Sequence, residues 1–289
     1  MTALRGWAAD YGVTRRQLRA LVEKNRRWLG CGGLPWATRL GYYPALAAAA
    51  VRDLRGAGGG AVEYLGRPFA YDNPRVPFLL LGYPDEVLGR VVANAGGPIR
   101  RVLDVGGNLG QFARTFAELV PGVERVDVLE PNPTILPLLA ANTAHLPAVR
   151  CFGAGVGPAG PGRLHVTPGR SGIGSLVPEN ARYRPDSPLV AVDVPLVADV
   201  GALTGWRDYD LLKVDVEGYE LEALAALEGV TFRWLFLEVT GRAKARAWRH
   251  SDLHALLARR FGPYDVRYHS EGGADATVFE VLLERVTPG

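Results

Sequence analysis

The sequence predicts an α/β fold in which a mostly helical N-terminal lobe precedes a doubly wound parallel sheet. From residue 100 onward, short apolar segments alternate with segments of helical periodicity, which indicates parallel strands joined by right-handed crossover helices. Residues 1–99 lack this alternation and instead hold helix-like segments separated by glycine-rich stretches. We therefore divide the chain into an N-terminal lobe, 1–99, and an α/β domain, 100–289.

The N-terminal lobe begins with a capping box at Thr14 and Gln17, which predicts a helix ending near Gly30. An Ala-rich stretch predicts a second helix over 44–54, and residues 61–71 are compatible with a short hairpin. A third helix over 84–94 has proline near its start and glycines after its end.

The α/β domain contains five apolar segments, which alternate with helices except between the third and the fourth, followed by two end strands. The predicted strands cover 101–105, 125–130, 149–152, 210–214, 234–239, 264–268 and 276–283, with an extra hairpin strand at 163–166. The predicted helices cover 110–120, 133–145, a segment ending at 227, and 251–260.

Composition excludes several classes of protein. The chain has 289 residues, a net charge of +3, 48% hydrophobic and 22% charged residues, so it is neither disordered nor a strongly basic nucleic-acid binder. Cys31 and Cys151 are far apart, which argues against a disulfide scaffold or zinc site and fits a reducing compartment. No signal peptide or bilayer-length apolar run is apparent, so we expect a cytoplasmic protein without nucleic-acid or membrane partners.

Polar residues follow the first two predicted strands of the α/β domain. The segment D-V-G-G-N-L-G, residues 104–110, joins a strand to a helix, and its glycines allow a tight turn and close backbone approach. Glu130 ends the next strand, where a carboxylate can accept two hydrogen bonds from a ribose diol. Together they predict a nucleotide or nucleoside site, because ligands bind beyond the carboxyl ends of the strands in this fold.

The glycine-rich turn does not match a dinucleotide site. Asn108 stands where G-x-G-x-x-G has its second glycine, which disfavours a nicotinamide dehydrogenase, and no G-K-[ST] phosphate loop is present. Asp104 would repel a pyrophosphate but suits a cationic ligand such as a sulfonium.

A third polar segment, K-V-D-V-E-G-Y-E, covers residues 213–220 at the end of a strand that should be continuously apolar. One interpretation is that Lys213, Asp215 and Glu217 form a polar group at the mouth of the site. The other is that Lys213 pairs internally with a neighbouring acid while Glu217 caps the next helix. Glu238 adds a carboxylate near the end of the following apolar strand.

The segments VLDVGGNLGQFA and LLKVDVEGYELEAL, with Glu130, Asn142 and Glu238, resemble the FkbM family of S-adenosylmethionine-dependent methyltransferases. The resemblance covers roughly residues 100 to 285. Gly107 stands where the family typically has alanine, and Thr240 stands where we associate the family with histidine. The second departure weakens a proposal of a histidine base at this position.

The resemblance implies a Rossmann-like class I methyltransferase sheet of seven strands, with the last strand antiparallel, and S-adenosyl-L-methionine as cofactor. It implies that residues 100–289 form the methyltransferase domain. We expect residues 1–99 to supply an acceptor pocket or oligomer contacts, and a homodimer is one alternative that the sequence leaves open. The implied cofactor-binding residues are Asp104, Gly106, Gly107, Asn108 and Gly110 near the methionine half, Glu130 at the ribose hydroxyls, and Pro131, Asn132, Gly153 and Ala154 near the adenosine.

The resemblance also favours O-methylation of a hydroxyl on a small secondary metabolite or sugar. A hydroxyl needs a base, for which Asp215, Glu217 and Glu238 are candidates; alternatively, Asp215 and Glu238 hold Mg²⁺. Methylation of nitrogen or a carboxylate, and a non-catalytic nucleotide-binding module, remain alternatives. His250 and His254 are weaker catalytic candidates. The acceptor pocket is expected between the N-terminal lobe and the sheet, with contributions from Tyr71, Asp72, Tyr83, Asp85, Glu86 and residues 171–175.

Overall fold

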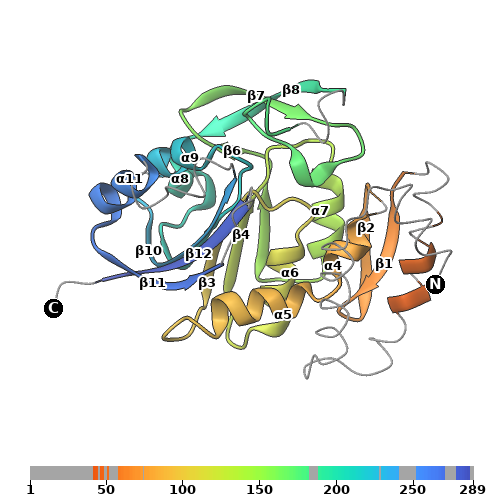
Figure 1. Cartoon of the computed structure of the whole chain (residues 1–289), viewed down its shortest axis with the longest axis horizontal. Helices are drawn as coiled ribbons and strands as arrows, with labels where there is room; N and C mark the ends of the chain where they lie inside the picture. The colour runs from red at the N-terminus through yellow and green to blue at the C-terminus, as the bar shows by residue number, and fades with distance from the viewer. Residues whose placement is uncertain are drawn as a thin grey trace.

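A seven-stranded sheet forms the centre of the computed structural model, with strand order β11-β12-β10-β9-β3-β4-β5 (Figure 1). The structure describes residues 42–44, 46–48, 51, 58–73, 75–181, 188–227, 229–240, 252–270 and 278–286. The strands are β3 (Arg101–Val105), β4 (Arg125–Leu129), β5 (Val149–Phe152), β9 (Asp208–Val214), β10 (Thr231–Thr240), β11 (Tyr264–His269) and β12 (Val278–Arg285). Strand β12 is antiparallel to both of its neighbours, and the other pairs are parallel, as predicted.

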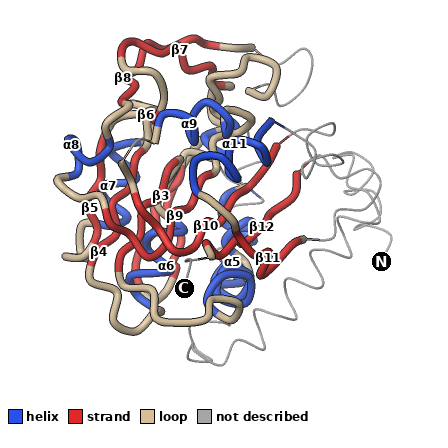
Figure 2. The backbone as a smooth tube through the Cα atoms, turned by 90° about the vertical axis from the view of Figure 1, so that its left-hand side faces the viewer, coloured by secondary structure: helices blue, strands red, loops and turns tan. Residues whose placement is uncertain are grey.

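Helices cover both faces of this sheet, which confirms the doubly wound prediction (Figure 2). Successive strand residues point to opposite faces, so Val102 and Leu103 of β3 belong to different apolar cores. One face packs against α5 (Tyr83–Val87) with its π-helical continuation η1 (Leu88–Val92), α6 (Gln111–Leu119) and α7 (Leu136–Thr143). The other packs against α8 (Val200–Thr204), α9 (Glu220–Ala226) and α11 (Asp252–Phe261).

The described N-terminal part contains a hairpin, β1 (Gly60–Tyr64) and β2 (Arg67–Tyr71), and a short helix α4 (Val76–Leu80). The hairpin confirms the expectation for 61–71, whereas α4 was not predicted. The hairpin lies beside α7 (Figure 1). Asn142 of α7 joins the two elements, because its Oδ1 accepts from Ala70 N and its Nδ2 donates to Ala70 O. Of the helix predicted over 44–54, residues 44, 46–48 and 51 are described and helical, while the helix starting near Thr14 lies outside the described residues.

A small second sheet has the order β6-β8-β7 and stands next to the ends of the parallel strands (Figure 2). Its strands are β6 (Gly155–Val156), β7 (Gly160–Val166) and β8 (Val190–Val197). The 3-10 turn η2 (Ser171–Ile173) lies between β7 and β8 in the sequence. The predicted strand at 163–166 is part of β7, and the sequence did not predict β6 or β8. Among the described residues, no helix has both the length and the apolar character needed to cross a bilayer.

Candidate active site

The loop after β3 is built from residues in left-handed backbone conformations. Gly106 and Gly110 have φ of 83° and 87°, and Asn108 has φ of 49°, a region that asparagine tolerates better than most residues. A Cβ atom on Gly106 would lie 1.9 Å from the carbonyl oxygen of Asp215. Glycine is therefore required here because the loops after β3 and β9 are in direct backbone contact.

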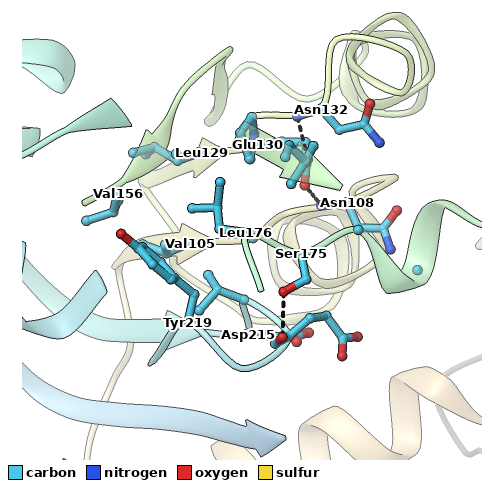
Figure 3. A pocket seen from close by; sticks show the side chains of 18 residues that line it. Val105, Asn108, Leu129, Glu130, Asn132, Val156, Ser175, Leu176, Asp215 and Tyr219 are labelled. Carbon is cyan, nitrogen blue, oxygen red and sulfur yellow. Dashed lines mark hydrogen bonds between the residues drawn. The ribbon is translucent and has the colours of Figure 1, made fainter. Parts of the chain in front are cut away.

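Glu130 lies immediately after β4 and is held by the backbone on both sides of it. Its Oε2 accepts from Asn108 N and its Oε1 from Asn132 N, each at 2.8 Å (Figure 3). The side chain is 7% exposed. Burial raises the pKa of Glu130 to about 7, although the two backbone donors and Lys213 oppose this effect. The carboxyl group is thus fixed in position and close to its titration point at neutral pH.

A narrow pocket opens beside Glu130 and encloses about 70 Å³. Of the predicted cofactor residues, Gly106, Asn108, Glu130, Pro131 and Asn132 line it. Gly155 and Val156 line it as well, whereas Gly153 and Ala154 do not. Figure 3 shows Ser175, Leu176 and Tyr219 at its boundary. The other lining residues are Val105, Leu129, Leu164, Gly172, Gly174, Asp215, Val216 and Glu217.

The other three predicted cofactor residues shape the loop without lining this pocket. A Cβ on Gly107 would meet Val128, and Gly110 precedes α6 as its N-terminal cap. Asp104 is fully buried on β3. Its role in the structure is an ion pair with Lys213, whose Nζ lies 3.1 Å from Asp104 Oδ1.

Lys213 on β9 sits among oxygen atoms from two strand ends. Besides Asp104, its ammonium contacts Asp215 Oδ2 at 3.3 Å and donates to Gly106 O at 2.8 Å. Burial lowers the pKa of Lys213, but Asp104 and Asp215 raise it by more, so the group stays charged. Lys213 therefore forms an internal pair with Asp104, as one interpretation of the sequence held. It also lines a second, larger cavity, as the other interpretation held.

A larger cavity of about 500 Å³ adjoins the narrow pocket, and both are lined by Asn108, Gly172, Asp215 and Glu217. Of the predicted acceptor residues, Tyr83, Glu86, Gly172 and Ile173 line it. Gly174 and Ser175 line the narrow pocket instead. The larger cavity is not lined by Tyr71, Asp72 or Asp85. The side chain of Ser171 lies outside what the structure describes. The sequence did not indicate several further lining residues, which come from α4, η1, α6, β10, β12 and the segment before η2: Leu79, Arg90, Gln111, Arg170, Phe236 and Glu280.

Three carboxylates meet in this cavity. One oxygen from each of Asp215, Glu217 and Glu238 lies within 4.8 Å of the others. The charge of Asp215, together with burial and Glu217, raises the pKa of Glu238 well above its ordinary value. The arrangement favours uptake of a proton or of a cation, because three negative charges in a partly buried space repel one another.

Glu217 does not cap the following helix. Instead, Glu220 Oε1 accepts from Gly218 N, and Glu217 has an unusual φ of 52°. Its carbonyl oxygen accepts from Ser175 Oγ at 2.7 Å and from Asn180 Nδ2 at 2.9 Å. The segment that closes the narrow pocket thus also fixes the backbone that carries one of the three carboxylates.

Of the two histidine candidates, His254 lies among the described residues and does not reach the site. His254 on α11 contacts the Tyr264 hydroxyl through Nδ1 and lines neither cavity. His250 and the side chain of Thr240 lie outside what the structure describes.

Comparison with known proteins places this site in a family. A model of the "Methyltransferase FkbM domain" matches residues 104–263, more than half of the chain. A search of curated proteins returned no match.

Solved structures with a similar fold include an N-methyltransferase and two proteins that contain S-adenosylmethionine. The N-methyltransferase NodS from Bradyrhizobium japonicum WM9 has a TM-score of 0.42 and 12% identity, covering 70% of this chain and 94% of its own. TYW2 from M. jannaschii, in complex with AdoMet, has a TM-score of 0.41, 13% identity and coverages of 79% and 87%. Fibrillarin from Aeropyrum pernix with bound S-adenosyl-L-methionine has a TM-score of 0.42, 10% identity and coverages of 68% and 74%. On the extent of the family match, the chain belongs to the FkbM family of S-adenosylmethionine-dependent methyltransferases.

Proposed function

We propose that the protein transfers a methyl group from S-adenosylmethionine to a hydroxyl oxygen of a small molecule held in the larger cavity. The observation that supports this most is the junction of two cavities, one beside Glu130 and one containing Asp215, Glu217 and Glu238. The larger cavity, about 500 Å³, is within the range of about 300–1,000 Å³ usual for small-molecule sites.

The residues around the narrow pocket fit the cofactor. We assign the ribose hydroxyls to Glu130, the methionine end to the loop of Gly106 and Asn108, and the adenine to the surface beside Asn132 and Val156. Bound there, S-adenosylmethionine supplies a methyl carbon activated by its sulfonium. The enclosed 70 Å³ is less than such a ligand needs, so we propose that the segment Gly172 to Leu176 moves outward on binding.

The carboxylate cluster is the proposed base. A hydroxyl attacks efficiently only as its proton is removed, and a base whose pKa approaches the working pH does this best. Glu238 is our first candidate, because its acidic neighbours and burial raise its pKa. Asp215 is held by Lys213 and faces the same cavity, where it orients the acceptor hydroxyl.

A divalent cation is the second arrangement that we propose for the same residues. Asp215, Glu217 and Glu238 offer carboxylate oxygens, the ligands that Mg²⁺ prefers. A bound cation would lower the pKa of the acceptor hydroxyl, and the acids would act as its ligands. Turnover that stops in a chelator and returns with Mg²⁺ supports this version, whereas unchanged turnover supports the carboxylate base.

The test is a methyl-transfer assay that measures S-adenosylhomocysteine formed from S-adenosylmethionine and a panel of hydroxylated, amine and carboxylate compounds. We expect turnover of hydroxylated compounds and a loss of about 100-fold or more in Glu238→Gln, because a general base contributes at least that much. Glu124→Gln, an exposed acid paired with Arg100, is the matched control. Turnover confined to amines or carboxylates, or full activity in Glu238→Gln in a chelator, would contradict O-methylation by this base. A protein that binds the cofactor but methylates nothing would be a non-catalytic module.

A further inference from the structure

Lys213 lies where the cofactor loop and the acceptor cavity meet. We infer that Lys213 is a positioning residue, which holds the Gly106 end of the cofactor loop against Asp215; the inference rests on the function proposed above. Its side chain is 7% exposed in the middle of the sheet, a place where an apolar residue is the usual choice. The question is therefore what the ammonium contributes there.

The first contribution is charge balance. Asp104 and Lys213 are direct partners on the neighbouring parallel strands β3 and β9, and their side chains point to the same face. Asp104 is fully buried, and within the described part of the chain its oxygens have no hydrogen-bond partner apart from this ion pair. A buried carboxylate without a counter-charge is strongly destabilising, so Lys213 stabilises the fold through Asp104.

The second contribution does not follow from charge balance. An ammonium has three N–H donors, and only one is needed for Asp104. The other two contacts of Lys213 are the Gly106 carbonyl and the Asp215 carboxylate, which belong to the two loops on either side of the cavity junction. The Phe112 ring, whose centroid is 5.6 Å from Nζ, covers the ammonium on the same face of the sheet.

The backbones of these two loops are already in contact. Asp215 N donates to Val105 O at 3.1 Å, and the space beside Gly106 is too small for a Cβ because Asp215 O occupies it. The hydrogen bond between Asp215 N and Val105 O thus joins the two loops through their main chains. Lys213 joins them a second time, through the Gly106 carbonyl and the Asp215 side chain. Removing the ammonium should leave Gly106 and Asp215 free to shift relative to the cofactor.

The experiment separates the two contributions by a double-mutant cycle with Asp104. Lys213→Met alone leaves Asp104 buried and unpaired, and we expect it to lower stability severely. Lys213→Met with Asp104→Asn removes both charges and should restore a cooperative thermal unfolding transition. Asp104→Asn alone keeps the Lys213 contacts with Gly106 and Asp215.

Calorimetry with S-adenosylhomocysteine is the readout. We expect the folded double variant to bind about tenfold to 100-fold more weakly than Asp104→Asn, as for a lost charge-assisted hydrogen bond. Equal affinity in the folded double variant and in Asp104→Asn would overturn the inference, because Lys213 would then serve only to balance Asp104. Absence of binding by the unmodified protein would instead count against the proposed function.

Discussion

Glu130 is a buried carboxyl group whose position is fixed before any ligand arrives. Each of its oxygens accepts a backbone hydrogen bond, one from Asn108 and one from Asn132. A carboxylate oxygen has a second lone pair, so both oxygens remain able to accept from a ribose diol. Glu130 is therefore a pre-positioned hydrogen-bond acceptor, and burial disfavours its ionised form.

Burial of Glu130 predicts a pH dependence for both stability and cofactor binding. Its pKa is about 7 in the folded protein and 4.5 ordinarily, so the folded state holds more protons between these values. The stability contributed by this group is therefore present at about pH 4.5 and is lost as the pH rises through about 7.

Affinity for S-adenosylhomocysteine should rise as the pH passes through about 7, because in the proposed complex the ribose would donate to the ionised Glu130 carboxylate. Calorimetry should show binding about tenfold tighter at pH 8 than at pH 6. Glu130→Gln should bind weakly and without this dependence. The same pH dependence in Glu130→Gln would assign it to another group.

Gly106 is the second residue whose replacement gives a specific result. Gly106→Ala would place a methyl group 1.9 Å from Asp215 O and would also force alanine to a φ of 83°, so we expect loss of cofactor binding. Gly122→Ala is the matched control, since it has a φ of 79° and open space around its Cβ position. The control should lose about 1 kcal/mol of stability and keep its affinity. Equal affinity for S-adenosylhomocysteine in the two variants would show that the close contact of the loops is unimportant.

The elements that sequence predicts best are parallel strands. Segment 101–105 coincides with β3, which is buried from Val102 to Val105 and reads as a nearly continuous apolar run. Segment 149–152 coincides with β5, which lies at the edge of the sheet and is partly exposed. Strand β6 has two residues, β8 is half exposed and contains Pro195, and α4 has five residues. None of these gives a periodic signal long enough to recognise.

Site residues that belong to regular strands can be predicted from sequence, whereas those brought together by tertiary packing cannot. Glu130, Asp215 and Glu238 follow or end parallel strands, whose carboxyl ends gather at one edge of the sheet. Arg90, Arg170 and Glu280 reach the larger cavity only through the packing of distant segments. Arg90 Nη1 pairs with Glu280 Oε1 at 2.5 Å across 190 residues of sequence, a contact that no local pattern specifies.

Arg114 provides a test of how the N-terminal hairpin is attached to the sheet domain. Its guanidinium is fully buried, pairs with Glu118 and donates to Pro68 O and Tyr64 O. Arg114→Met should lower the free energy of unfolding by about 3–5 kcal/mol, because it leaves buried acceptors and a carboxylate unpaired. Arg100→Met removes an exposed pair and should change it by less than about 1 kcal/mol. Urea unfolding measures both, and similar values for the two variants would mean that the hairpin is not held by Arg114.

At the scale of the whole molecule, the sheet brings a nucleoside-type pocket and an acid-lined cavity to one junction. The loops after β3, β4 and β9 form the pocket, while the described N-terminal segment, β10 and β12 complete the cavity. Lys213 and Asp215 lie where the two meet. In the function proposed above, this organisation separates the pocket for the methyl donor from the cavity for its acceptor.

Calorimetric titration with S-adenosylhomocysteine at pH 8 tests this central claim most directly. We predict saturable one-to-one binding by the unmodified protein and a loss of about 100-fold or more in Glu130→Ala, since two hydrogen bonds to a charged group are removed. Glu124→Ala, at an exposed position beside Arg100, should bind like the unmodified protein. Absence of binding by the unmodified protein, or equal affinity in Glu130→Ala, would contradict the account.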